Sequence, residues 1–243
     1  MLDSPAGYDE IRRKIEKKPA LRRFYLEVYR EYQRSLQRCP RAGVALELGS
    51  GAGFAKEIVP ELVTSDLLPY RGVDQVVDAT RLPYADQSLR LLCMMNVFHH
   101  IPDVGAFLSE AERCLVSGGR IFIADQHVGP ISRPILKYLH HEPFDPAAAN
   151  WEFDSTGPLS GANGALAWMV FVRDKAMFEK RFPGLRLLRY QQHAPLRYWL
   201  AGGLKEWSLI PEWGIGMAEA LDSLLIRLWP ELGSFVYVEI VRR

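Results

Sequence analysis

Short apolar runs separated by turns and polar segments fill the first half of the chain, and they constrain its fold more than any other feature. They lie at residues 44–48, 62–65, 75–77, 89–95 and 120–124. The run at 89–95 is apolar without alternation, which is typical of a parallel strand covered on both faces. Between the last two runs, apolar residues recur at helical spacing over 104–115, with Asp103 as the cap and Gly118-Gly119 at the end. This alternation predicts an α/β domain built on a parallel sheet.

The first run leads into a turn with three glycines, Gly49-Ser50-Gly51-Ala52-Gly53, before a helical pattern begins at Phe54. Glycines between a buried strand and a helix let backbone N–H groups approach a ligand, with the positive end of the helix behind them. The dinucleotide fingerprint requires Gly or Ala where this chain has Phe54. The Gly-Lys-Ser/Thr of a phosphate-binding loop is also missing. A tight turn that binds nothing is the alternative.

Two carboxylates follow the next two apolar runs. Asp66 ends the run at 62–65 and Asp78 ends the run at 75–77. In open α/β sheets, ligands bind at the carboxyl ends of the strands, where the strand order reverses. A carboxylate at Asp66 is therefore expected to accept both ribose hydroxyls of a nucleotide, and one at Asp78 to accept the exocyclic amine of adenine.

Together these segments resemble the class I S-adenosylmethionine-dependent methyltransferases of the small-molecule type. The matching segments are Glu47 to Gly53, Ser65-Asp66, residues 78–84, residues 96–103 and Leu115 to Gly119. The resemblance covers about residues 42–125. It implies a Rossmann-like, seven-stranded, mostly parallel sheet with helices on both faces, and S-adenosylmethionine as the cofactor. The residues that it assigns to cofactor binding are Glu47, Gly49, Ser50, Gly51, Gly53, Asp66, Leu67, Asp78, Ala79, Asn96 and Val97. Only 11 residues separate Asp66 from Asp78, too few for the helix usual there.

The rest of the chain is divided by its patterns. Two helices separated at Pro19 are expected over 8–38, so residues 1–43 form an N-terminal helical extension or lid. Residues 44–243 form the methyltransferase domain, with a cofactor-binding half at 44–125 and acceptor-binding loops plus a helical insertion at 126–232. The irregular residues 125–165 indicate a functional loop. Further strands are expected at 185–190 and 235–241, and a helix near 215–229. The Trp-rich segment 196–232 suits an acceptor pocket, a dimer face or a lipid contact.

Histidines are the candidate catalytic groups. The sulfonium of the cofactor already activates the methyl group, so the protein mainly aligns the reactants and excludes water. An oxygen acceptor still benefits from a base, and histidine suits neutral pH. We expect His99 and His100 to be catalytic, with His99 as the base; capping or packing is the alternative for both. His127, His140 and His141 are expected to contact the acceptor. No metal site is expected, because adjacent histidines rarely bind one ion.

Composition narrows the function. The net charge is +1, and residues 1–43 hold 11 Lys and Arg against 6 Asp and Glu, but no basic stripe continues, which argues against nucleic acid. Three scattered cysteines and the absence of a long apolar window favour a cytoplasmic protein. We expect methyl transfer to a small or lipid- or sugar-linked acceptor at oxygen. The alternatives are a methyltransferase-like binding protein without turnover and an NAD(P)-dependent oxidoreductase. The oligomeric state and a peripheral membrane contact stay open.

Overall fold

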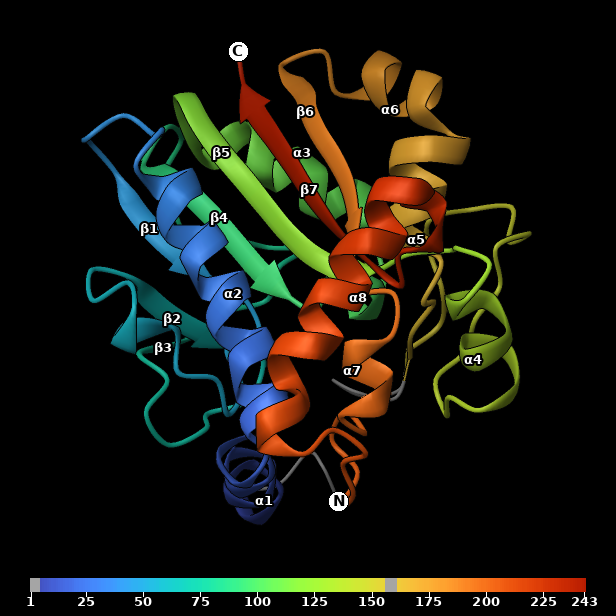
Figure 1. Cartoon of the computed structure of the whole chain (residues 1–243). Coiled ribbons are helices and arrows are strands. Elements are labelled where there is room, and N and C mark those ends of the chain that lie inside the picture. Colours follow the sequence, from blue (N-terminus) through green and yellow to red (C-terminus); the bar gives the residue numbers. More distant parts are fainter. Residues whose placement is uncertain (1–4, 156–160) are drawn as a thin grey trace.

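The computed structural model describes residues 5–155 and 161–243. Its central feature is a seven-stranded sheet in the order β3-β2-β1-β4-β5-β7-β6 (Figure 1). The strands are β1 Val44–Glu47, β2 Val63–Asp66, β3 Gln75–Val76, β4 Leu89–Met95, β5 Leu115–Gln126, β6 Leu185–His193 and β7 Phe235–Arg242. Neighbours pair in parallel from β3 to β5, whereas β7 is antiparallel to β5 and to β6. The predicted mostly parallel sheet with an antiparallel last strand is therefore confirmed.

Helices cover both faces of this sheet (Figure 1). They are α1 Pro5–Lys17, α2 Pro19–Leu36, α3 Val104–Cys114, α4 Ser132–Tyr138, α5 Leu166–Trp168, α6 Lys175–Arg181, α7 Arg197–Leu200 and α8 Ile215–Leu228. One face packs against α2, and the opposite face packs against α3, α5 and α6. Among the described residues, no helix combines the length and the apolar character needed to cross a membrane.

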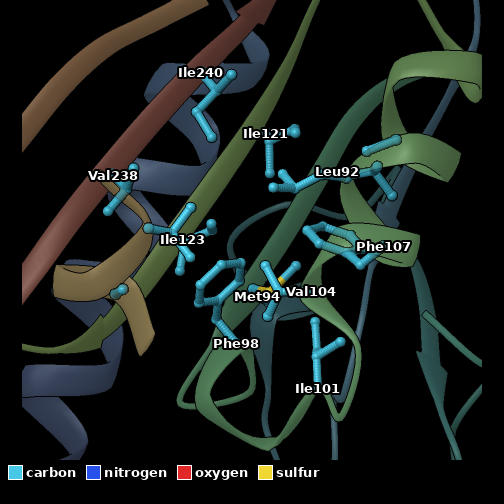
Figure 2. Close-up of a cluster of buried hydrophobic side chains, with 14 of the residues drawn as sticks. Leu92, Met94, Phe98, Ile101, Val104, Phe107, Ile121, Ile123, Val238 and Ile240 are labelled. Carbon is cyan, nitrogen blue, oxygen red and sulfur yellow. The ribbon is translucent and has the colours of Figure 1, made fainter. Parts of the chain in front are cut away.

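The non-alternating run of β4 is explained by these two layers. Leu92 and Met94 point into the core on the α3 side, where Figure 2 shows them among side chains of β5, β7 and α3. Leu91 and Cys93 belong to the core on the α2 side. Since each of these side chains is fully buried, both faces of the strand gain the free energy of apolar burial, about 1.5–3 kcal/mol for a leucine.

The N-terminal helices are confirmed, with their boundary at Lys18, directly before Pro19. The predicted apolar face of α2 lies on the sheet: Leu21, Phe24, Val28 and Tyr32 are buried. The ring of Tyr32 meets that of Phe122 of β5 edge-on, with their centroids 5.5 Å apart. The second helix is therefore part of the core rather than an appendage of it.

The helix expected to begin at Phe54 is wrong. The glycine turn is followed only by the 3-10 turn η1, Ala55–Glu57. The chain then reaches Pro60, which has no N–H to continue a helix, and enters β2 at Val63. Phe54 packs in the same core cluster as α2, so α2 covers the sheet face beside the glycine turn. No helix dipole supports this turn.

Two further boundaries differ from the sequence patterns. The helix α3 ends at Cys114, and β5 already begins at Leu115, so Gly118 and Gly119 lie inside the strand. Gly118 has a φ of +78°, a backbone conformation that suits glycine, and the β4–β5 register shifts there. The predicted cap is confirmed, since Asp103 accepts a hydrogen bond from the N–H of Ala106 at 2.8 Å. The irregular segment contains α4, and its residues 156–160 lie outside the described residues.

Candidate active site

A cavity of about 710 Å³ opens at the carboxyl ends of β1, β2 and β4. All eleven residues assigned to cofactor binding line it, as do His99, His100, His140 and His141. Its other walls come from α1, from the end of β5 and from the turns after α4 and α7. Parallel strands in this order reverse direction of connection beside β1, which is the position where α/β sheets bind ligands.

The first two glycines of the turn are needed for different reasons. Gly49 has a φ of +64°, and a Cβ there would overlap the side chain of Val97. Gly51 has a φ of +43°, but a Cβ there would find only Asp66 Oδ2 at 3.9 Å and the Gly49 carbonyl at 4.0 Å. The first glycine is therefore required for packing, whereas the second keeps the cavity open beside the backbone.

Asp66 closes the turn from the end of β2. Its Oδ2 accepts a hydrogen bond from the N–H of Gly51 at 2.9 Å, and its Oδ1 accepts one from Leu68 at 3.2 Å. Burial raises the pKa of this carboxyl above its ordinary value, and the backbone hydrogen bonds oppose the shift. The carboxylate is thus held at the cavity wall by the turn that it supports.

Glu47, at the end of β1, is 3% exposed, and its Oε2 finds no hydrogen-bond partner among the described residues. Burial raises the pKa of Glu47 to about 7, with a hydrogen bond from Ser50 opposing the shift and the nearby Asp66 adding to it. A buried carboxylate oxygen without a partner is costly unless a ligand supplies one. Because Glu47 lines the cavity, that ligand would be bound there.

The far wall of this half is formed by the segment after β3. Asp78 is exposed, and its Oδ1 accepts hydrogen bonds from the backbone N–H and the hydroxyl of Thr80 at 2.8 and 2.7 Å. Its other oxygen is left for the cavity side. As expected from the short spacing, a turn rather than a helix connects β2 to β3 in the described chain.

His99 and His100 lie in η2, Phe98–His100, directly after β4. The Nδ1 of His99 is 2.6 Å from Oδ1 of Asp125, and its Nε2 is 3.2 Å from Oε2 of Glu142. The Nδ1 of His100 donates to the carbonyl of Gly161 at 3.0 Å, and its Nε2 is 3.4 Å from Oε1 of Glu142. One carboxylate thus faces both imidazoles.

The charges in this cluster are strongly coupled. Burial alone would lower the pKa of His99, but Asp125 and Glu142 outweigh it and raise the pKa to about 10. Burial would raise the pKa of Glu142, but His100 and His99 lower it well below its ordinary value. In this arrangement His99 keeps its proton at neutral pH. It can act as a free base only if Glu142 moves away or another cation takes the place of that proton.

Sequence reasoning missed Asp125 and did not connect Glu142 with His99. Asp125 follows the apolar run 120–124 as Asp66 and Asp78 follow theirs, so the same strand-end signal was present. Glu142 lies in an irregular segment with no periodicity, and no local pattern indicates its direction.

The three histidines expected at the acceptor are placed differently. His140 lines the cavity with its Nδ1 3.5 Å from Oε2 of Glu142, and His141 lies at the rim with a side chain 75% exposed. His127 is not brought to the cavity in the described part of the chain. It is buried, with Nδ1 2.9 Å from the hydroxyl of Tyr190 and Nε2 3.2 Å from Glu231.

The roof of the cavity joins both ends of the chain. Tyr8, Ile11 and Ile15 line it from α1, and Trp199 and Trp207 line it from the Trp-rich segment. Buried Lys18, between α1 and α2, donates to the carbonyls of Ala201 at 3.1 Å, Gly203 and Lys205 at 2.8 Å. This ammonium group fastens the N-terminal helices to the turn after α7. The roof is mostly aromatic and aliphatic, which suits an apolar acceptor.

Comparisons with known proteins agree with this site. Residues 46–123 match the family model described as a methyltransferase domain. Methyltransferase GfsG of Streptomyces halstedii is 34% identical over 92 residues, which cover 35% of this chain and 33% of that protein. The chain thus matches about a third of the length of this curated relative. Phosphoethanolamine N-methyltransferase 2 of Haemonchus contortus, solved with S-adenosyl-L-methionine, has a TM-score of 0.54 at 12% identity, covering 98% of this chain and 57% of that one. This second likeness concerns the fold.

Proposed function

We propose that this chain, which carries a class I S-adenosylmethionine-dependent methyltransferase domain, transfers the methyl group of S-adenosylmethionine to an oxygen atom of a small or lipid- or sugar-linked acceptor. The observation that carries the proposal is the meeting of two sets of residues in one cavity. Glu47, the glycine turn and Asp66 line one side of it, and the His99 cluster lines the other.

The cofactor side has the groups that S-adenosylmethionine requires. The unpartnered Oε2 of Glu47 suits the ammonium group of the methionine part, and the open space beside Gly51 lets that part approach the backbone. Asp66 suits the ribose hydroxyls, and Asp78 with Ala79 suits the adenine. The donor set therefore fits the cofactor, which supplies an activated methyl group when bound.

The acceptor side has the groups that methyl transfer to oxygen requires. His99 and His100 lie at the end of β4, where an acceptor entering under Trp199 and Trp207 would meet the methyl group. Alignment of the acceptor oxygen with the methyl group and exclusion of water are the main tasks of such a site. The choice of oxygen rests on this imidazole and carboxylate cluster, because an uncharged hydroxyl is a weak nucleophile until its proton is removed.

Asp66→Ala tests the cofactor assignment. Loss of charge-assisted hydrogen bonds to the ribose is expected to weaken binding of S-adenosylhomocysteine by about 10- to 100-fold, or about 1.5–3 kcal/mol. Isothermal titration calorimetry measures this effect. The control is Asp86→Ala, which removes an exposed carboxylate that pairs with Arg113. Equal affinity of wild type and Asp66→Ala would refute the ribose assignment. Binding without transfer of a tritiated methyl group in any lysate would favour a binding protein.

The roof should respond to the cofactor. Hydrogen exchange in residues 5–17 is expected to slow when S-adenosylhomocysteine binds, because α1 lines the cavity. Lys18→Met removes the three bonds to the turn after α7, and we expect it to speed exchange in α1 by about tenfold or more. Exchange followed by mass spectrometry reports both effects. Identical exchange with and without ligand would make α1 a static wall rather than a lid.

A further inference from the structure

We propose that His99, His100 and Glu142 form a binding site for a divalent transition-metal ion, such as Zn²⁺ or Mn²⁺, on the acceptor side of the cavity. Each residue offers one ligand atom, and these atoms lie within 4.8 Å of one another. The binding site does not depend on methyl transfer. The role of the ion in preparing the acceptor rests on the proposed function.

The distances suit one shared ion. Ligand atoms about 2.1 Å from a tetrahedral ion lie about 3.4 Å apart, and neighbouring ligands of an octahedral ion about 3.0 Å apart. The Nε2 of His99 is 3.2 Å from Oε2 of Glu142, and the Nε2 of His100 is 3.4 Å from Oε1. The two rings are brought together by the tight turn η2, with centroids 4.2 Å apart. Adjacent histidines therefore converge here, contrary to the expectation from their spacing.

The outer hydrogen bonds orient both imidazoles for metal binding. The carbonyl of Gly161 can only accept, so the Nδ1 of His100 carries the proton and its neutral Nε2 has a free lone pair. The Nδ1 of His99 has Asp125 as its partner at 2.6 Å. Histidines that bind a metal through one nitrogen commonly donate from the other to a carboxylate or a carbonyl. Both outer partners are present here.

The site lacks a positive charge between its ligand atoms when His100 is neutral. Its Nε2 lone pair then faces a carboxylate oxygen, and two acceptors repel each other. An ion between them would bind both. Two imidazole nitrogens and one carboxylate favour a transition metal over Mg²⁺ or Ca²⁺, which prefer oxygen ligands.

The ion would have free positions toward the cavity. All three ligands line the cavity, and three protein ligands with an open position are typical of a catalytic rather than a structural metal site. An acceptor hydroxyl bound at that position would lose its proton to water more readily. Its oxygen would then form the bond to the methyl carbon as the carbon–sulfur bond of the cofactor breaks, leaving S-adenosylhomocysteine.

The test is calorimetry of the full chain after chelation and dialysis, with ZnCl₂ and MnCl₂ as probes and MgCl₂ for comparison. We expect one saturable Zn²⁺ or Mn²⁺ ion per chain and weaker binding of Mg²⁺. Glu142→Gln and His100→Gln are expected to weaken binding about tenfold or more. The matched control Glu231→Gln, which alters the His127–Glu231 pair outside the cavity, should bind like wild type. X-ray absorption at the metal edge should show imidazole ligands that His100→Gln reduces.

Absence of saturable binding in the wild type would overturn the proposal, as would equal ion affinity of Glu142→Gln, His100→Gln and wild type. Circular dichroism of each variant separates loss of the site from loss of the fold. Titration of the same samples with S-adenosylhomocysteine keeps the two proposals apart. An ion that binds where this compound does not would support the metal site and refute the cofactor assignment. The reverse result would refute only the metal site.

Discussion

Substitution of His99 by alanine is expected to reduce methyl transfer by about 10²- to 10⁴-fold, the range for a positioned group that removes or prepares for removal of a proton. His99 lines the cavity and is held by Asp125 on one side and Glu142 on the other. Binding of S-adenosylhomocysteine should change little, because Glu47, Asp66 and the glycine turn form the cofactor side. Single-turnover assays and calorimetry on the same preparation measure the two quantities separately.

Companion variants identify the role of His99. Asp125→Asn keeps the shape of the side chain but weakens the orientation of the imidazole, so turnover should fall by about 10- to 100-fold with cofactor affinity intact. Glu231→Gln, outside the cavity, should leave turnover unchanged. If His99→Ala retained full turnover, the ring would have only a packing role. A parallel loss of cofactor binding would instead indicate a collapsed site.

Glu47→Gln is expected to stabilise the ligand-free protein at pH 8 and to weaken cofactor binding. The pKa of Glu47 is raised to about 7 from the ordinary 4.5, chiefly by burial. Between these two pH values the unfolded chain has lost a proton that the folded chain still holds, so stability falls as the pH rises from 4.5 to 7. The shift corresponds to a penalty on the order of 3 kcal/mol above pH 7. Glutamine, which does not ionise, removes it.

The pH dependence supplies the internal control. Near pH 5.5 the folded wild type holds a protonated Glu47, so the difference in unfolding free energy from Glu47→Gln should be smaller than at pH 8. Binding of the cofactor ammonium group favours the ionised carboxylate, so wild-type affinity should rise with pH up to about 7 and level off above it. Below pH 7, binding should release a proton, which calorimetry in buffers of different ionisation enthalpy detects. Affinity that is flat with pH in the wild type would contradict the assignment of Glu47.

Local patterns in the sequence determined the sheet and the cofactor side of the cavity. The apolar runs mark β1 to β5 because a parallel strand buried on both faces has no room for polar side chains. The acids at 66 and 78 and the glycines at 49 and 51 could be assigned for a related reason. Strand ends in a parallel sheet meet at one edge, so residues far apart in the chain are placed together by the topology alone.

The acceptor side required the tertiary structure. Glu142 faces His99 and His100 only because the irregular chain after α4 folds back over the end of β4, and such a segment has no periodicity from which to infer its direction. Lys18 is a charged residue by its sequence, yet carbonyls almost two hundred positions away enclose it.

The helical pattern at Phe54 is a similar case. Its apolar residues do face the core, as their spacing predicts, but α2 already covers that part of the sheet and only a 3-10 turn forms. Periodicity reports which side chains are buried. It does not report which element covers them, because that depends on contacts between segments that share no local pattern.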